Sequence, residues 1–188
     1  YMAKQSTDIW QQYESIKRDI LDGKIAPFYL LYGKEHYFID KICELLTSHI
    51  IPESERDFGQ LVYYGADVTP AQIVSTARQY PMMVTRQLVV VKEAQMVRKI
   101  EDVGGYFDNI MPSTILVICY KIPNEQGSSK SIDKRSKFYK DAAKVGVVFE
   151  SNPIPDYKMA SWIEGFVKSL GVIIEPDAAA MLAESCGT

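Results

Sequence analysis

The chain has 188 residues, of which 47% are hydrophobic and 24% are charged, and its formal net charge is −3. This composition excludes a disordered chain and provides residues for one complete domain and part of a second. The small negative charge argues against attraction of the whole molecule to nucleic acid. No apolar run approaches the ~20 residues of a membrane span, so no membrane association is expected.

Apolar runs alternate with helical periodicity along most of the chain. Five short apolar runs predict strands, and the segments between them have the 3.6-residue spacing of helices. The predicted strands are 28–32, 61–64, 88–91, 114–120 and 145–149. The predicted helices are 7–22, 37–50, one that begins at Pro70, a weaker one at 100–110 and a basic one at 133–143. This alternation predicts an α/β fold with a doubly wound, five-stranded parallel sheet and flanking helices.

A proline-rich linker, residues 152–155, separates this alternation from a purely helical pattern. We therefore expect an α/β domain at 1–152 and the start of a small helical domain at 153–188. The sequence stops at the point where its last predicted helix ends. The expectation is a fragment of a longer protein.

The first strand and helix meet at a turn that matches only the start of a phosphate-binding loop. In the motif G-x-x-x-x-G-K-[ST], backbone N–H groups cradle the phosphates, the lysine binds their oxygens and the hydroxyl binds magnesium. Counted from Gly33, the second glycine is Phe38, the lysine is Ile39 and the hydroxyl residue is Asp40. The sequence therefore predicts the scaffold of a nucleotide enzyme without its chemistry, no bound cofactor, and a mechanical or adaptor role.

A second part of the ATPase machinery is also missing. Where a P-loop ATPase ends its third strand in an Asp-Glu pair, this chain has Lys92 and Glu93, and an ammonium group cannot bind magnesium. The two histidines, His36 and His49, flank one helix without metal-ligand spacing, so capping or surface roles are expected. We expect no catalytic residue and no metal site.

The three cysteines are far apart and lie in apolar segments. They are Cys43, Cys119 and Cys186. This pattern favours small buried side chains in a reducing compartment, and hence a cytoplasmic protein.

The junction before the third strand carries an apolar group with a candidate binding role. Met82 and Met83 are adjacent, so both cannot face one core, and Tyr80 lies beside them across Pro81. Such side chains suit a hydrophobic pocket of a partner. Ordinary packing at a helix–strand junction is the alternative that the residues leave open.

Six positive charges gather between residues 130 and 144. They are Lys130, Lys134, Arg135, Lys137, Lys140 and Lys144. A helix with this pattern could bind phosphates with salt-dependent affinity, and the first four are candidate DNA-facing residues. A solvated helix face is the alternative.

Four segments together resemble one family. FYLLYGKEHYFID, YPMMVTRQLVVVKEA, TILVICY and SIDKRSKFYK are similar, in this order, to the delta subunit of the bacterial DNA polymerase III clamp loader. The resemblance implies an AAA+-like fold that has lost ATP binding, followed by part of a helical lid-type domain. It also implies that a C-terminal collar domain is absent from this chain.

The resemblance further implies a role in DNA replication. An apolar plug in this family inserts into a pocket of the sliding clamp, the beta subunit, and helps to open it. By position the plug falls on Tyr80, Met82 and Met83, which favours binding over core packing. The implied partners are the clamp, the gamma/tau and delta prime subunits, and primed DNA in the assembled loader.

Within this resemblance, the chain has no ATPase or polymerase chemistry of its own but belongs to the DNA polymerase III holoenzyme, and ATP acts through other subunits. Two alternatives stay open. One is a divergent AAA+ NTPase, and the other is a DNA-binding module that uses the basic helix at 130–144.

Overall fold

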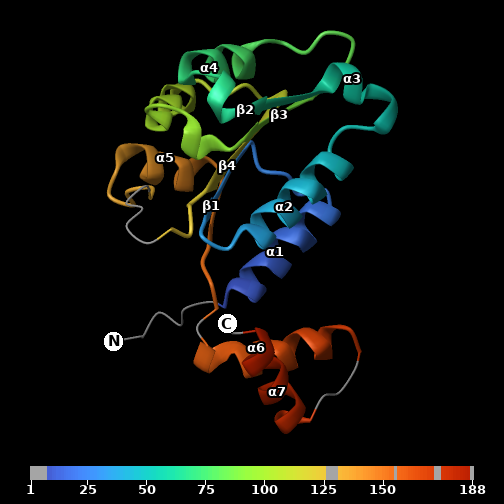
Figure 1. Ribbon diagram of the computed structural model, residues 1–188. Coiled ribbons are helices and arrows are strands. Elements are labelled where there is room, and N and C mark those ends of the chain that lie inside the picture. Colours follow the sequence, from blue (N-terminus) through green and yellow to red (C-terminus); the bar gives the residue numbers. More distant parts are fainter. Residues whose placement is uncertain (1–7, 126–130, 155, 172–174, 187–188) are drawn as a thin grey trace.

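The computed structural model describes residues 8–125, 131–154, 156–171 and 175–186. A central sheet carries helices on both faces, and a pair of helices, α6 (Asp156–Ser169) and α7 (Pro176–Cys186), lies beyond one end of it (Figure 1). Within the described ranges, no helix is both long enough and apolar enough to cross a membrane.

The sheet has five parallel strands in the order β2-β3-β4-β1-β5. The strands are β1 (Phe28–Gly33), β2 (Gln60–Tyr64), β3 (Gln87–Lys92), β4 (Thr114–Lys121) and β5 (Val147–Ser151). The three central strands, β3, β4 and β1, are buried along almost their whole length. Because helices cover both faces of the sheet, these strands have continuous apolar runs. The predicted five-stranded parallel α/β fold is confirmed.

Alternate side chains of β1 pack against different groups of helices. The helices of this domain are α1 (Ile9–Leu21), α2 (His36–His49), α3 (Arg56–Gly59), α4 (Pro70–Arg78), the 3₁₀ helix η4 (Ile100–Asp108) and α5 (Lys137–Val145). Phe28, Leu30 and Tyr32 join the core beneath α4, η4 and α5. Tyr29 and Leu31 join the core beneath α1 and α2. Because the strands are parallel, the turns that follow β1, β3 and β4 lie at one edge of the sheet.

Helix α4 begins where the sequence predicts. The Thr69 hydroxyl accepts a hydrogen bond from the Gln72 amide at 3.3 Å, and the Gln72 side chain accepts one from the Thr69 amide at 2.9 Å. This reciprocal capping box satisfies two N–H groups, and Pro70 occupies the first turn, where its missing N–H costs nothing.

The basic helix α5 begins at Lys137, so its predicted start at Asp133 is wrong. Ser136 is the N-cap, and its hydroxyl accepts a hydrogen bond from the Tyr139 amide at 3.2 Å. The preceding residues form a turn in which the Ser136 amide donates to the Asp133 carbonyl at 3.0 Å. The serine and aspartate side chains thus favour a turn and a cap over another helical turn. The segment predicted as a weak helix at 100–110 is the 3₁₀ helix η4.

Aromatic side chains join α6 to α1. The Trp10 ring lies 6.0 Å from the Trp162 ring and 5.2 Å from the Phe166 ring, both in edge-to-face geometry. Trp162 and Phe166 stack on each other with ring centroids 5.5 Å apart. These contacts fix the helix that follows the linker against the first helix of the chain. The division into domains at residue 152 stays a prediction.

Candidate functional site

The turn between β1 and α2 is closed against β5. Gly33 has a φ of +143°, and a Cβ atom there would lie 1.8 Å from the carbonyl oxygen of Ser151. The Glu35 amide donates to that oxygen at 3.0 Å, and the Ser151 hydroxyl donates to the Glu35 carbonyl. The Glu35 side chain accepts a hydrogen bond from the Tyr37 amide at 3.1 Å. Two amides that could have faced a phosphate are therefore used within the protein.

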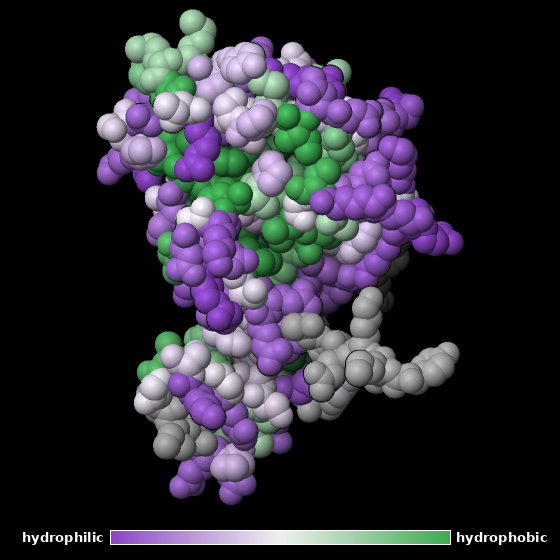
Figure 2. Space-filling view, turned by 180° about the vertical axis from the view of Figure 1, so that it is seen from behind, coloured by the Kyte–Doolittle hydropathy of each residue, from purple (hydrophilic) through white to green (hydrophobic). Residues whose placement is uncertain are grey.

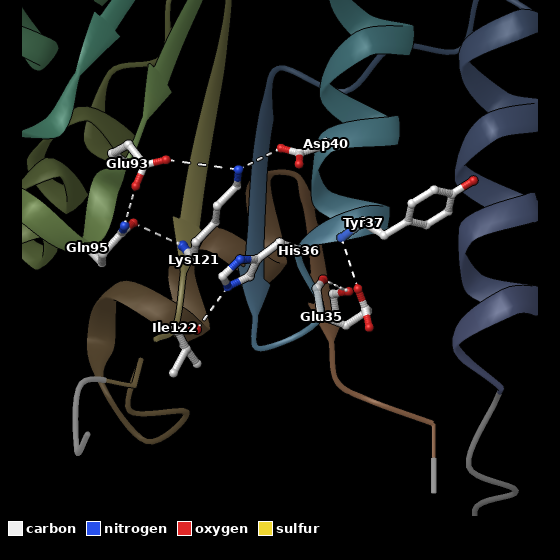
Figure 3. Close-up of polar contacts among 9 residues, drawn as sticks. Glu35, His36, Tyr37, Asp40, Glu93, Gln95, Lys121 and Ile122 are labelled. Carbon is white, nitrogen blue, oxygen red and sulfur yellow. Dashed lines mark hydrogen bonds and ion pairs between the residues drawn. The ribbon is translucent and has the colours of Figure 1, made fainter. Parts of the chain in front are cut away.

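Charged side chains fill the space beside this turn. Lys121, at the end of β4, places its Nζ 2.8 Å from Asp40 Oδ1 and 4.0 Å from Glu93 Oε1 (Figure 3). The Lys121 amide donates to Gln95 at 3.1 Å, and Gln95 in turn donates to Glu93. Burial lowers the pKa of Lys121, but the hydrogen bond from Lys121 to Asp40 and the negative charges outweigh it and raise the pKa above its ordinary value. The lysine therefore stays protonated within the ion pairs.

The residues at the three lost P-loop positions lie where the sequence predicts. Phe38 and Ile39 are buried in the core beneath α1 and α2, and Asp40 forms the ion pair with Lys121. His36 is hydrogen-bonded to the carbonyl of Ile122 at 2.9 Å, next to the same turn (Figure 3). Two of the positions that bind phosphate in a P-loop are therefore packed in the core, and the third is ion-paired. Around the described residues, no group of three or more His, Cys, Asp or Glu side chains could hold a metal ion.

We expect isothermal titration calorimetry to detect no binding of ATP with magnesium to the folded chain. The closed turn and the buried apolar side chains offer no set of hydrogen-bond donors to a triphosphate. The two carboxylates beside Lys121 repel its negative charge. Measurable heat at ATP concentrations up to the millimolar range would instead support the alternative of a divergent NTPase.

The apolar group at the α4–β3 junction projects into solvent. Tyr80, Met82 and Met83 are 80%, 81% and 82% exposed, so ordinary core packing is wrong for all three side chains. We call these three residues the plug. Figure 2 shows hydrophobic side chains projecting at the upper left, the end of the molecule where Figure 1 places α3 and this junction. The structure thus brings the three predicted residues together on one exposed segment.

Buried contacts hold the base of the plug. Gln87, only 4% exposed, donates from Nε2 to the carbonyls of Thr76 and Gln79 at 3.1 and 3.0 Å and to the Thr114 hydroxyl at 2.9 Å. Met83 has a φ of +67°, which is unfavourable for a residue with a side chain and persists only where its surroundings impose it. The exposed side chains therefore stand on a defined backbone.

Phe58 adds to the plug from a distant part of the sequence. It lies on α3, is 56% exposed and lines a groove of about 620 Å³ together with Tyr80, Met82 and Met83. Sequence reasoning missed it. The available signal was a single aromatic residue in the otherwise polar segment ESERDFGQ.

The candidate DNA-facing residues are mostly paired with carboxylates. Lys134 forms an ion pair with Glu150, Arg135 with Asp133 at 3.2 Å, and Lys137 with Asp141 at 2.7 Å. Lys134 and Arg135 lie in the turn before α5 and not on the helix. Lys130 lies outside the described residues. These pairs reduce the free positive charge, and DNA contact by the segment stays a prediction.

Glu150 accepts hydrogen bonds from three side chains in this region. In the Glu150→Gln variant, the free energy of unfolding should therefore vary less with pH in the acid range. Burial raises the pKa of Glu150, but hydrogen bonds from Lys134, Asn152 and Tyr32 outweigh it and hold the pKa below its ordinary value. A lowered carboxylate pKa stabilises the fold above the unfolded-state value, and this stabilisation is lost as the pH falls through the folded-state value.

In urea unfolding, the stability advantage of the wild type over Glu150→Gln should therefore shrink as the pH falls from about 6 to about 3. An advantage that stays constant over this range would contradict the assignment.

Comparison with known proteins identifies the family. The family model described as DNA polymerase III, delta subunit, matches residues 29–148, which is well over half of the chain. The chain belongs to this delta subunit family. Bacillus subtilis DNA polymerase III subunit delta is 26% identical over 157 residues, which cover 78% of this chain and 41% of that protein.

The fold also matches a solved structure of the delta family. The B. subtilis DNA clamp loader delta protein YqeN aligns with a TM-score of 0.71 and 20% identity, over 90% of this chain and 51% of that one. The α/β architecture is therefore that of a clamp loader delta protein. The chain spans about half the length of these delta proteins, or less.

Proposed function

We propose that this chain is the clamp-binding part of a clamp loader delta subunit, and that it grips the sliding clamp with the plug and performs no chemistry itself. Membership of the delta family supports this function. The observation that carries it is the exposure of Tyr80, Met82 and Met83, each at 80% or more, directly after Gln79, whose carbonyl accepts a hydrogen bond from the buried Gln87 side chain. Exposed apolar groups of this kind mark interaction sites.

The plug provides enough apolar surface for a specific contact. Burying about 200–300 Å² of side chain at ~25 cal/mol/Å² gives roughly 5–7 kcal/mol before the costs of ordering and association. Methionine side chains adapt to an irregular pocket, and tyrosine adds a rigid aromatic anchor. Phe58 and the adjoining groove extend the same surface.

Opening of the clamp requires more than tight binding. A ligand shifts an equilibrium only by the difference between its affinities for the two states. The delta surface must therefore fit the opened ring better than the closed one. In the proposed loader, the partners are the gamma/tau and delta prime subunits, and ATP acts through subunits other than this one. The work takes place on primed DNA in the cytoplasm.

Replacing both methionines of the plug by alanine should weaken binding of the sliding clamp from the same organism. For Met82→Ala combined with Met83→Ala we expect a loss of at least about 1–2 kcal/mol, or roughly 5–30-fold in Kd. The reason is the loss of buried side-chain contacts at the centre of the interface. Surface plasmon resonance with immobilised clamp measures the change directly.

Met96→Ala is the matched control, because Met96 is also exposed, at 58%, but follows β3 at the opposite end of that strand. It should bind the clamp like the wild type. Thermal unfolding of the double variant should match the wild type as well. No clamp binding by the wild-type chain, or equal losses of binding and thermal stability in the double variant, would disprove the proposal.

A further inference from the structure

Two cysteines that are far apart in the sequence meet inside the α/β domain. Cys43 lies on α2 and Cys119 on β4, and they are 7% and 3% exposed. Both belong to the core beneath α1 and α2, both line one small pocket, and their thiol groups lie close enough to interact. Buried thiols that lie side by side satisfy the first requirement for a disulfide, which is proximity.

Both cysteines also line a small pocket at the edge of the sheet. The pocket has a volume of about 290 Å³, and the ion pair between Lys121 and Asp40 forms part of its wall. Lys92 and Lys121 line it together with three carboxylate residues, Asp40, Glu44 and Glu93, so the space beside the thiols is polar and charged. The volume exceeds that of a few water molecules, so a molecule the size of hydrogen peroxide can enter. The two cysteines are therefore shielded from large molecules, but a small polar reagent can reach them through the pocket.

The surroundings assign different roles to the two sulfur atoms. The hydrogen bond from Cys119 lowers the pKa of Cys43, and the positive charges of Lys92 and Lys121 lower it further against the effect of burial. The hydrogen bond to Cys43 and burial raise the pKa of Cys119 well above its ordinary value. Cys43 is also the more exposed of the two, at 7% against 3%, so it is the sulfur that attacks first and Cys119 follows in the second step.

We propose that Cys43 and Cys119 form a peroxide-reactive pair that closes to a disulfide between α2 and β4. In the first step the Cys43 sulfur attacks one oxygen of hydrogen peroxide, the O–O bond breaks, and the products are a sulfenic acid and water. In the second step the Cys119 sulfur attacks the Cys43 sulfur, the S–O bond breaks, and a second water leaves with the thiol proton. The two thiols lose two electrons and two protons, and the peroxide is reduced to two waters.

The disulfide would cross-link elements that are separated by more than seventy residues of sequence. Such a link restricts the unfolded chain and so stabilises the folded one. It would also fix α2, which begins at the closed turn after β1, to the centre of the sheet. The inference stands apart from clamp binding, because the plug lies at the other end of β3.

The test uses the whole chain with Cys186→Ser, so that only the two thiols of the pair remain. After treatment with hydrogen peroxide, the intact mass should fall by two hydrogen atoms, no thiol should react under denaturing conditions, and the melting temperature should rise. Dithiothreitol should reverse all three changes. In the same background, Cys119→Ala should stop at a sulfenic acid that dimedone traps, and Cys43→Ala should react with peroxide at least about tenfold more slowly.

Thiols that stay reduced in the folded protein, under conditions that oxidise free cysteine, would overturn the inference. The same holds for a disulfide found only between two chains on a non-reducing gel, or for equal reactivity of the two alanine variants. If an alanine variant does not fold, the protein with both thiols decides by itself whether the disulfide forms. Its readouts are the mass change and the rise in melting temperature that dithiothreitol reverses.

Discussion

Replacing Gly33 by alanine should destabilise the folded chain by at least about 3 kcal/mol, because the added methyl group meets backbone that cannot move away. Its Cβ would lie 1.8 Å from the Ser151 carbonyl oxygen and 2.5 Å from the carbonyl carbon. That carbonyl also accepts the Glu35 amide, so moving β5 away would break the closed turn. The φ of +143° adds strain for any residue with a side chain. Urea unfolding measures the loss, and the melting temperature should fall by roughly 6–12 °C or more.

Alanine variants of three other glycines distinguish the two causes of this loss of stability, which are the steric collision and the positive φ. Gly146→Ala introduces a collision, since its Cβ would lie 2.1 Å from the Phe28 carbonyl oxygen, but involves no positive φ. Gly23→Ala imposes a φ of +79° with nothing within 4 Å, and should cost about 1–2 kcal/mol. Gly105→Ala involves neither problem and should lie within about 0.5 kcal/mol of the wild type. If Gly33→Ala is no more destabilising than Gly23→Ala, the closed-turn interpretation is wrong.

Replacing Gln87 by leucine should cost about 1–3 kcal/mol of stability and should also weaken clamp binding, although Gln87 is only 4% exposed. Leucine fills a similar volume but removes all three hydrogen bonds from Nε2. The fully buried Thr114 hydroxyl and the part-buried Gln79 carbonyl then lose this donor. Because Gln79 directly precedes the plug, its release should let Tyr80 and the methionines sample many orientations, and binding must then order them.

Hydrogen exchange distinguishes this positioning role from a general loss of stability. In Gln87→Leu, amides of residues 79–86 should exchange faster, while those of the β1 and β4 strands keep most of their protection. Gln60→Leu is the matched control, because Gln60 has a buried Oε1 with no hydrogen-bond partner among the described residues. It should leave stability unchanged or increase it, and clamp binding should not change. A Gln87→Leu protein that binds the clamp like the wild type would exclude the positioning role.

The ion pairs in the basic segment show that a run of positive residues in the sequence does not give the charge available for binding. Lys137 and Asp141 stand four residues apart on α5, so their ion pair was visible in the sequence. The pair between Lys134 and Glu150 joins the turn before α5 to β5, and only the fold brings them together. A count of positive residues along the chain therefore overestimates the charge available to a phosphate backbone.

Much of the fold followed from local patterns. The continuous apolar runs of the central strands predicted burial on both faces, and Thr69 with Pro70 predicted the start of α4, because capping and periodicity act between neighbours in the chain. The absence of the P-loop residues could also be read locally, since Phe38, Ile39 and Asp40 occupy positions at fixed distances from Gly33. The exposure of the plug followed in part, because two adjacent methionines cannot share one face.

Strand order and packing decided the rest. The order β2-β3-β4-β1-β5 places Ser151 against Gly33, Lys121 beside Asp40, and Cys119 beside Cys43. None of these pairs is close in the sequence, and no periodic pattern encodes which strands become neighbours. The sequence by itself indicates which side chains are apolar enough to be buried and which backbone conformations are favourable. The partner that each buried group finds is set by the free energy of the whole packed chain, and so only the tertiary structure determines it.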